Sequence, residues 1–367
     1  MWLVVAVLIA ALGVGVVWDQ RRSSGTAPAP TPTTPPTPNQ TPPNRLPTAP
    51  PPSPTPVTLW PGESGTRTQP LADDIPAGTL FARSSDTLYA VDTRTGAMVI
   101  TPAELGTSDP VSMVPVKDGV LLQSWDSTPD YLVRDGRRPV KVSGLFTDAR
   151  QVLPGPNGRL WVISQDDQPQ FGGTATLVDL RGRRNGPRLP SAGGYRSDGN
   201  NGLLLEDVGG VWQAYPTPIR QITTGSVAAV GAHHYHLLEC DPQHRCTTSV
   251  LDRQTGQRTQ QRPDLDRAYG NTVLSPDGRW AARIDGYDNN EAPHTTITRL
   301  ADHTVTATFL EAPSPATASP SSIAWLSTEW LAVITNGRIA LHNTTTGQTT
   351  APELTLGGLL QLTWRPR

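Results

Sequence analysis

Short apolar runs alternate with turn-forming sequences along most of the chain beyond residue 75. The runs are rich in Val, Leu, Ile and Trp, and turn sequences such as KDG, GPNG, NNG and SPDG separate them. Runs of this length, bounded by Gly, Pro, Asn and Asp, are typical of β-strands. Since residues 75–367 show no convincing helical periodicity, the pattern predicts an all-β domain over this range.

The apolar runs recur at a regular interval. Seven of them superpose when they are aligned on the turns that precede them, with a spacing of about 42 residues, and four-stranded propeller blades repeat every ~40 to 45 residues. The aligned runs are residues 80–82, 120–122, 160–162, 203–205, 236–238, 280–282 and 330–332. With the aligned run as the second strand of each blade, the interval predicts a seven-bladed β-propeller. In the sixth blade we expect strands at 272–274, 280–284, 295–299 and 304–310.

The two ends of this repeat are irregular in a complementary way. The first unit offers three strands, within residues 79–83, 87–91 and 98–101, whereas the C-terminus has one strand too many, at 359–364. If this last strand becomes the first strand of the first blade, the ring closes without an open edge. A pair of β-sandwiches is the alternative, but it predicts neither the interval nor the extra strand. We therefore expect a seven-bladed β-propeller closed by the C-terminal strand, over residues 75–367.

An uninterrupted apolar run occupies residues 2–18. As a helix it would be ~26 Å long, which just spans a bilayer core. Trp2 and Trp18 would lie at the two interfaces, and Asp19 ends the segment. A cleaved signal peptide is the alternative, but no A-x-A-like site follows the apolar core. We expect an uncleaved transmembrane signal-anchor over residues 1–22.

The orientation of this anchor has to be weighed against its flanking charge. Arg21 and Arg22 follow the apolar run, so charge counting alone would keep the rest of the chain in the cytoplasm. The two cysteines of the chain, Cys240 and Cys246, favour a location outside the cytoplasm. We expect a single-pass cell-membrane protein whose C-terminal domain is extracytoplasmic, with basic residues ahead of Met1 at the true start.

A proline-rich segment separates the anchor from the β domain. Residues 27–56 contain 14 prolines, and most of the other residues are Thr, Ala, Ser and Asn. Such a chain favours polyproline II, which rises ~3.1 Å per residue and would reach up to about 90 Å. We expect a disordered Pro/Thr-rich linker over residues 23–74 that acts as a spacer. Docking of proline-binding modules on its PxxP patterns is an alternative, although such patterns arise here by composition alone.

Cys240 and Cys246 are the only cysteines in the chain. In the predicted blade register they flank the turn between the second and third strands of the fifth unit, where opposed Cα atoms lie about 5.5 Å apart. We expect a disulfide between them and therefore an oxidising compartment. Metal binding with His244 or His236 and two free thiols are the alternatives.

The turn sequences resemble those of a known group of propellers. SPDGR at 275–279, followed by an apolar strand, resembles the TolB-like and WD40-like propellers of bacterial envelopes, and LYAVDTRTG at 88–96 is similar to repeats of quinoprotein-type propellers. The DxxTG turn recurs at 252–256 and, more loosely, at 343–347. The resemblance implies a periplasmic or extracytoplasmic propeller that binds partners. It carries over no catalytic residue.

The charges of the chain nearly balance. Their signs differ, however, between the connections that join second to third strands and those that join third to fourth strands. The 30 basic and 32 acidic residues give a net charge of −2, which argues against a generic nucleic-acid binder. The connections between second and third strands carry carboxylates that predict an acidic binding face: Asp126, Asp130, Asp166, Asp167, Asp241, Asp285, Asp288 and Glu291. Those between third and fourth strands carry arginines that predict a basic face: Arg94, Arg134, Arg137, Arg181, Arg183 and Arg253. Alternatively, these charges are ordinary loop charges without a partner.

Motifs for catalysis and metal binding are weak. The sequence contains no GxSxG or SxxK element and no glycine-rich phosphate loop. Residues 233–236 supply a histidine cluster, but a third ligand cannot be named. Residues 285–291 are rich in oxygen ligands, yet the calcium pattern with its central glycine is absent. We expect no catalytic residue, no metal and no cofactor.

A binding or scaffolding role at the cell envelope follows from these features. We expect a monomer whose partners are the membrane, through the N-terminal helix, and an envelope protein or cell-wall component, but no nucleic acid. The alternative is a hydrolase, lactonase or quinone-linked oxidoreductase with a site in the central channel. Residues on the predicted innermost strands are mostly apolar, which favours binding: Val111, Met113, Gln151, Leu153, Val227, Ala229, Val273, Ala324, Leu360 and Leu362.

Overall fold

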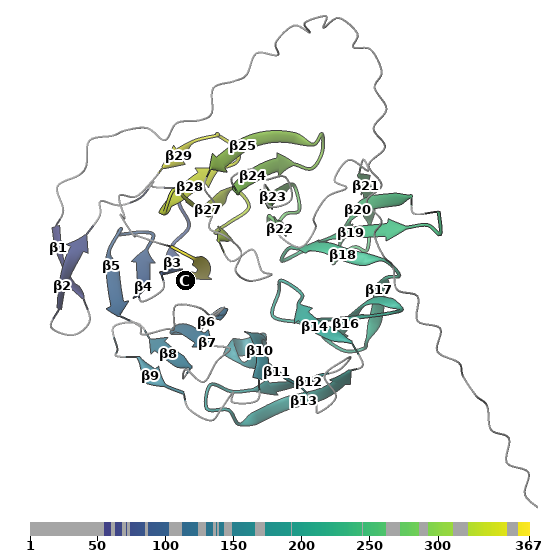
Figure 1. Cartoon of the computed structure of the whole chain (residues 1–367), viewed down its shortest axis with the longest axis horizontal. Helices are drawn as coiled ribbons and strands as arrows, with labels where there is room; N and C mark the ends of the chain where they lie inside the picture. The colour runs from purple at the N-terminus through teal and green to yellow at the C-terminus, as the bar shows by residue number, and fades with distance from the viewer. Residues whose placement is uncertain are drawn as a thin grey trace, which may run out of the picture. The chain divides into compact units, whose positions relative to one another are not determined.

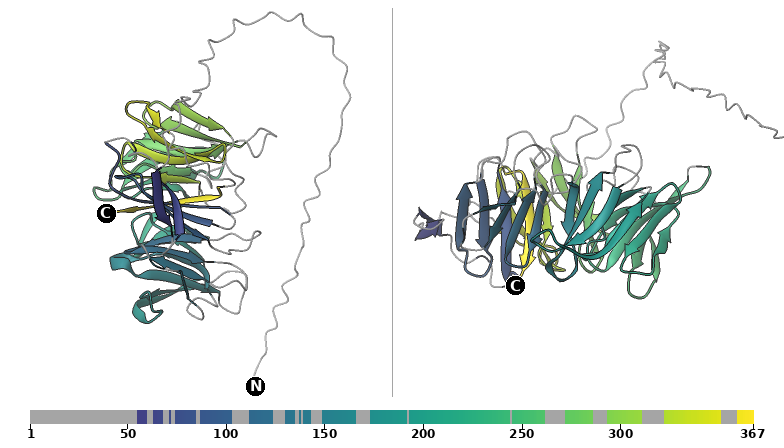
Figure 2. Two further views of the ribbon diagram at one scale, coloured as in Figure 1. Left: turned by 90° about the vertical axis from the view of Figure 1, so that its left-hand side faces the viewer. Right: turned by 90° about the horizontal axis from the view of Figure 1, so that it is seen from below.

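The β domain consists of four-stranded sheets arranged around a common centre (Figure 1). The computed structural model describes residues 55–59, 63–67, 71, 74–84, 87–102, 112–123, 130–134, 137, 139–142, 149–165, 173–191, 193–243, 245–261, 272–285, 293–310, 322–350 and 359–367. All of them belong to one compact unit, Pro43–Arg367. Side views show the strands of the blades running between the two faces of the ring (Figure 2).

The first four blades are given from the innermost strand outward. Blade 1 contains β30 (Gln361–Pro366), β3 (Gly78–Arg83), β4 (Thr87–Asp92) and β5 (Met98–Pro102). Blade 2 contains β6 (Ser112–Val116), β7 (Gly119–Gln123), β8 (Tyr131–Arg134) and β9 (Val140–Lys141). Blade 3 contains β10 (Ala149–Pro154), β11 (Leu160–Gln165), β12 (Gly173–Val178) and β13 (Arg184–Ser191), with a short 3-10 turn, η1 (Pro156–Gly158), after β10. Blade 4 contains β14 (Gly194–Ser197), β15 (Leu203–Asp207), β16 (Gly210–Tyr215) and β17 (Arg220–Thr223).

The remaining three blades have the same order. Blade 5 contains β18 (Ser226–Val230), β19 (His234–Cys240), β20 (Cys246–Asp252) and β21 (Arg258–Gln261). Blade 6 contains β22 (Thr272–Leu274), β23 (Trp280–Asp285), β24 (His294–Arg299) and β25 (Thr304–Leu310). Blade 7 contains β26 (Ile323–Trp325), β27 (Trp330–Thr335), β28 (Arg338–Asn343) and β29 (Thr349–Thr350). Each of the seven aligned apolar runs falls in the second strand of its blade, as predicted.

The C-terminal strand closes the ring. β30 pairs antiparallel with β3 over its whole length, from Gln361 opposite Arg83 to Pro366 opposite Gly78. It lies next to β26 on one side and next to β6 on the other, so it is the innermost strand of blade 1. The predicted seven-bladed propeller and its closing strand are therefore confirmed, with the strand itself shifted by two residues from the predicted bounds.

The core is divided among the contacts between neighbouring blades. Each pair of neighbouring blades shares one buried apolar cluster, including the pair formed by blades 7 and 1. Consecutive residues of a second strand contribute to different clusters: Leu80 packs towards blade 7, whereas Phe81 packs towards blade 2. Because side chains alternate between the two faces of a sheet, a strand buried on both faces reads as a continuous apolar run. This burial explains why the second strands gave the clearest signal in the sequence.

The DxxTG turns fold as their sequence predicts. The Oδ1 atoms of Asp92, Asp252 and Asn343 each accept hydrogen bonds from the backbone N–H groups two and three residues further on. The glycine four residues on has a positive φ, at 66°, 73° and 71° respectively. Only glycine adopts this conformation without a steric penalty, so these turns end their third strands at fixed positions.

A separate hairpin lies within the stretch expected to be an unstructured linker. β1 (Thr55–Leu59) and β2 (Glu63–Arg67) form a two-stranded antiparallel sheet next to β5. The structure thus differs from the expectation for residues 23–74 in this part, because the dense proline ends at Pro56 and strand-forming residues follow it. The rest of the linker and the expected anchor at 1–22 lie outside the described residues. Within the described ranges, no helix has the length and apolar character needed to cross a membrane.

Candidate functional site

The connections between strands differ in length at the two ends of the sheets. The turns between first and second strands and between third and fourth strands are no longer than five residues; we call the end where they lie the short-turn face. At the opposite end, the long-connection face, lie the connections between second and third strands and those from one blade to the next. Several of these are much longer, at residues 103–111, 262–271, 286–293, 311–322 and 351–360.

Three of the eight predicted acidic residues are described, and all three lie at the long-connection face. Asp130 directly precedes β8, and Asp285 ends β23, where it pairs with Arg283 at 2.7 Å and accepts a hydrogen bond from Thr296 at 2.8 Å. Asp241 follows β19 in the turn described next. The others fall outside the described residues: Asp126, Asp166, Asp167, Asp288 and Glu291. The acidic face as a whole therefore stays a prediction.

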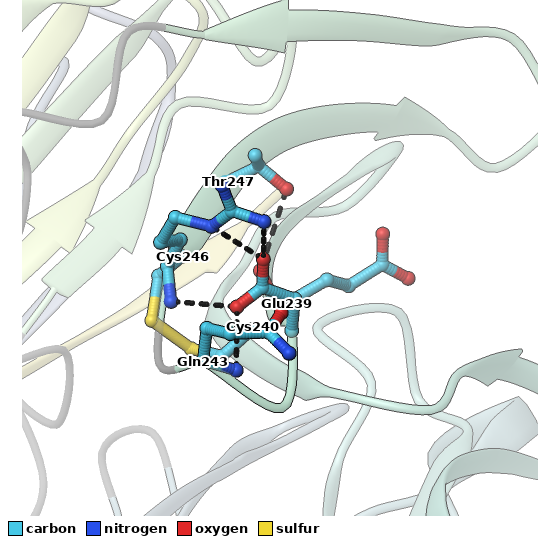
Figure 3. Close-up of a disulfide and its surroundings, with 7 residues drawn as sticks. Glu239, Cys240, Gln243, Cys246 and Thr247 are labelled. Carbon is cyan, nitrogen blue, oxygen red and sulfur yellow. Dashed lines mark hydrogen bonds and ion pairs between the residues drawn. A yellow bond between two sulfur atoms is a disulfide. The ribbon is translucent and has the colours of Figure 1, made fainter.

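The tip of blade 5 carries the predicted disulfide (Figure 3). Cys240 and Cys246 lie directly opposite each other in the register of β19 and β20, and their sulfur atoms are bonded. Their Cα atoms are 3.9 Å apart, closer than the expected ~5.5 Å. No cysteine is left free. The predicted pairing is confirmed.

Asp241 organises the turn that the disulfide closes. Its Oδ1 atom accepts hydrogen bonds from the backbone N–H groups of Gln243 and Arg245, both at 2.9 Å, and its Oδ2 atom pairs with the Arg245 guanidinium at 2.7 Å. The hydrogen bond from the Arg245 N–H is the main cause that lowers the pKa of Asp241. This carboxylate is thus held ionised, and its charge is largely matched within its own turn.

The six predicted basic residues behave in three ways. Arg94, Arg137 and Arg181 are exposed at the short-turn face. Arg134 and Arg183 pair with Asp118 and Asp179, each at 3.0 Å. Arg253 turns inward, with 11% of its side chain exposed, so it does not belong to a basic surface. The structure corrects the prediction at this residue.

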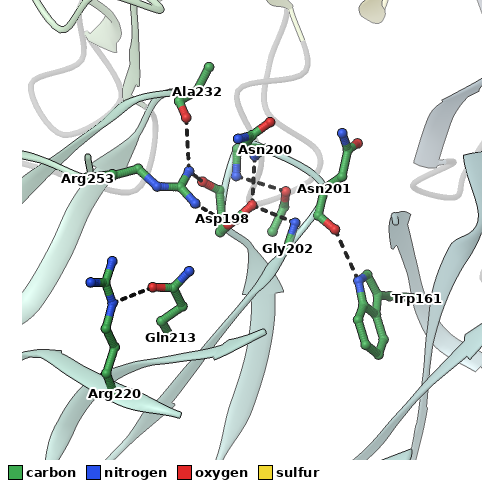
Figure 4. A network of polar contacts seen from close by, with 11 residues as sticks. Trp161, Asp198, Asn200, Asn201, Gly202, Gln213, Arg220, Ala232 and Arg253 are labelled. Carbon is green, nitrogen blue, oxygen red and sulfur yellow. Dashed lines mark hydrogen bonds and ion pairs between the residues drawn. The ribbon is translucent and has the colours of Figure 1, made fainter. Parts of the chain in front are cut away.

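Arg253 joins blade 5 to blade 4 through a buried ion pair (Figure 4). Its guanidinium pairs with the carboxylate of Asp198, which is 1% exposed and lies in the turn after β14. It also donates to the backbone oxygens of Asp198, at 2.7 Å, and Ala232, at 3.1 Å. The second carboxylate oxygen of Asp198 accepts the N–H groups of Asn200 and Gly202, both at 2.7 Å. Both oxygens of this buried carboxylate are therefore satisfied.

Two further groups add to the contacts at the boundary between blades 4 and 5. Tyr235 is fully buried beneath Arg253, whose Cζ atom lies 4.6 Å from the centroid of the tyrosine ring, and burial raises the pKa of Tyr235. Arg196 of β14 pairs with Glu206 at 2.7 Å and donates to the backbone oxygen of Val227 at 2.5 Å. Because Arg253 and Arg196 are each paired with a carboxylate of their own, Asp198 and Glu206, the arrangement is suited to fixing two blades against each other. We call it the blade 4–5 clasp.

The histidine cluster does not form a metal site in the part of the chain that the structure describes. His233 is exposed and His236 is buried. The Nε2 atom of His234 lies 3.8 Å from the Oδ2 atom of Asp252. No group of three or more His, Cys, Asp or Glu residues that could hold a metal ion occurs among the described residues. Most of the oxygen-rich segment 285–291 lies outside them.

Several apolar side chains of the innermost strands do not face a central channel as predicted. Leu153, Val227, Ala229 and Leu362 are buried in the clusters between neighbouring blades. The reason is that side chains of an innermost strand alternate between the two adjoining blades. The apolar character of these positions therefore reflects packing, and Val111 lies outside the described residues.

Two buried histidines predict a loss of stability in mild acid. Burial lowers the pKa of His236 and of His342 to about 4, whereas histidine in an unfolded chain titrates near ~6.5. The unfolded state therefore binds more protons as the pH falls from about 6.5 to about 4, and each site removes up to about 3 kcal/mol of unfolding free energy. Urea melts should show this fall, and His342→Asn should reduce it. The matched change at exposed His233, His233→Asn, should leave it unchanged; a flat profile in the unsubstituted protein would contradict the assignment.

Comparison with known proteins finds similar folds but no family. No family model matches the chain, and no curated protein matches it. Solved structures with a similar fold include AztD from Citrobacter koseri, at 14% identity over 80% of this chain and 90% of that chain, with a TM-score of 0.41. Another is a puromycin-hydrolysing peptidase from Mycobacterium tuberculosis, at 12% identity over 80% of this chain and 54% of that chain, with a TM-score of 0.42.

Hsv2 from Kluyveromyces lactis is a further similar structure, at 10% identity over 79% of this chain and 94% of that chain, with a TM-score of 0.42. One of these names denotes an enzyme, the peptidase, and its activity is not assigned to this chain. The strand pairing within the chain itself shows the fold class. The protein is a seven-bladed β-propeller with a disulfide at the tip of blade 5.

Proposed function

We propose that this propeller is a membrane-anchored, extracytoplasmic binding module of the cell envelope. The observation that carries the proposal is the Cys240–Cys246 disulfide, which uses both cysteines of the chain. Disulfides form and persist in oxidising compartments. With the apolar run at residues 2–18 as a single membrane span, the propeller lies outside the membrane. The proline-rich linker then holds it at a distance.

The long-connection face is the proposed contact surface for the partner. Connections carry most binding residues in proteins because a rigid scaffold positions them while their sequences can vary. In the sequence, the connections from one blade to the next add Asp109 and Asp148 to the carboxylates predicted between second and third strands, whereas Asp264 and Asp266 are balanced by Arg262 and Arg267. A partner with a cationic surface is therefore favoured. The TolB-like turn SPDGR at 275–279 supports the same kind of role.

Site-specific photo-crosslinking tests this surface. Val208, which is 108% exposed in the β15–β16 connection, and exposed Asn336, between β27 and β28, lie on the long-connection face. Exposed Thr255 and Thr346 are matched positions in turns of the short-turn face. With a photoreactive amino acid at each position of the full chain in cells, we expect crosslinked products from Val208 and Asn336 but not from Thr255 and Thr346. Equal crosslinking from both faces, or none from the first pair, would contradict the proposal.

A further inference from the structure

Arg83 is the most deeply buried arginine in the described ranges. It ends β3 at the long-connection face, and only 3% of the residue is exposed. Its Nε atom donates a hydrogen bond to the backbone oxygen of Ser84 at 2.9 Å, which holds the guanidinium at the end of its own strand. Burial lowers the pKa of Arg83, but an arginine stays charged in proteins. Burial of a charge is strongly unfavourable unless an opposite charge is paired with it.

The charge of Arg83 is not matched by any residue that the structure describes. The buried Nη1 atom has no hydrogen-bond partner among the described residues, and no described carboxylate pairs with the guanidinium. Arg253 shows the contrast, because its guanidinium, with 11% of the side chain exposed, is paired with the carboxylate of Asp198. Arg83 therefore presents an unmatched positive charge and a free hydrogen-bond donor.

Gln361 lies beside Arg83 and presents a free acceptor. The two residues are opposite each other in the register of β30 and β3, so their Cβ atoms are about 5 Å apart and their side chains project from the same side of the sheet. Gln361 is 8% exposed, and its buried Oε1 atom has no hydrogen-bond partner in the described part of the chain. A charged donor and a neutral acceptor thus lie side by side in blade 1.

Blade 2 provides an apolar wall opposite this pair. Phe81, two residues before Arg83, packs in the cluster between blades 1 and 2, and side chains two residues apart in a strand lie on the same side. Met113 and Tyr131 of blade 2 pack against the same cluster, and both are only partly buried. The polar pair therefore faces apolar surroundings, in which its interactions with a ligand are stronger than in water.

We propose that Arg83 and Gln361 form a binding site for a small hydroxycarboxylate. The carboxylate of the ligand accepts hydrogen bonds from the guanidinium of Arg83, and the neighbouring hydroxyl group donates to Oε1 of Gln361. One guanidinium beside a neutral amide matches a single negative charge, so a carboxylate fits better than a doubly charged phosphate. An amino acid also carries a donor, but its ammonium group cancels the negative charge that Arg83 requires.

Thermal melts of the full chain in detergent test the ligand class with three probes of similar size, glycolate, acetate and glycine. The ionic strength is held constant with chloride. A ligand that binds only the folded state raises the melting temperature, by about 3 °C at ten times its dissociation constant. We expect glycolate to bind about tenfold more tightly than acetate and glycine to cause no shift. No shift with glycolate, an equal shift with acetate or an equal shift with glycine would overturn the proposal.

Substitutions distinguish a ligand site from an ion pair within the chain. Arg83→Met removes a buried charge that no described residue matches, so without ligand this variant should melt at the same temperature or higher. It should also lose the shift with glycolate. Gln361→Met should bind glycolate no more tightly than acetate. The matched change Arg338→Met, at an exposed position where β28 begins on the same face, should leave the melting temperature and the shift unchanged.

A lower melting temperature of ligand-free Arg83→Met would overturn the proposal, because it would show that a carboxylate of the chain itself is paired with Arg83. A shift with glycolate that survives in Arg83→Met would overturn it as well. None of these results bears on crosslinking to a protein partner, so the proposed binding function is tested separately.

Discussion

Deletion of residues 359–367 is expected to abolish the folded propeller. The deletion removes β30, which pairs with β3 at six consecutive positions, and it removes Leu359 and Leu362 from the cluster between blades 7 and 1. Full burial of one leucine contributes about 1.5 to 3 kcal/mol, and the exposed edge of β3 adds unpaired backbone groups. These losses approach the total stability of a typical domain, about 5 to 15 kcal/mol. Near-UV circular dichroism and thermal melts should show no cooperative transition.

A relocated strand provides the control for this deletion. If residues 359–367 are moved to a position directly ahead of residue 74 through a short linker, the same strand can pair with β3 from the other end of the chain. We expect this variant to recover a cooperative melt. A truncated chain that melts like the unsubstituted protein would show that β30 does not close the ring.

Asp198→Ala is expected to cost about 3 to 5 kcal/mol of unfolding free energy. The change leaves the Arg253 guanidinium, 11% exposed, without its carboxylate, and a buried charge without a partner is strongly destabilising. It also removes the acceptor for the N–H groups of Asn200 and Gly202. Urea melts would measure the loss directly.

A matched pair on the surface separates burial from charge pairing. Asp179 accepts backbone hydrogen bonds and pairs with Arg183 in the turn after β12, but the Arg183 side chain is 69% exposed. Asp179→Ala should therefore lower the unfolding free energy much less than Asp198→Ala, since exposed pairs contribute little. In a double-mutant cycle, Asp198→Ala and Arg253→Met should show a coupling energy of about 1 to 3 kcal/mol. Equal losses at both aspartates and no coupling would contradict the blade 4–5 clasp.

The strands of blade 6 show why most of the fold could be predicted from the sequence. The expected strands at 272–274, 280–284, 295–299 and 304–310 agree with β22 to β25 to within one residue at each end. Turn chemistry at SPDG marks the start of the second strand, and burial of Trp280, Ala281 and Ala282 makes the first half of β23 apolar. Both patterns depend only on residues close together in the chain, so they can be recognised in a single sequence.

Contacts between blades could not be predicted in the same way. The register correctly placed Arg253 in the turn between β20 and β21, but the inward direction of its side chain depends on Asp198, 55 residues earlier. The sequence similarly predicts that apolar residues of the innermost strands line a channel, because a single sequence does not show that two neighbouring blades cover them. The β1–β2 hairpin was missed because the proline-rich composition before Pro56 masked the strand-forming residues that follow.

The oxidation state of Cys240 and Cys246 in cells tests whether the propeller is extracytoplasmic. Cells that make the full chain would be denatured in acid and alkylated without reduction, and the peptides that contain the two cysteines would be identified by mass spectrometry. We expect the two peptides to remain joined by a disulfide and to become alkylated only after reduction. Two thiols alkylated without reduction would contradict it.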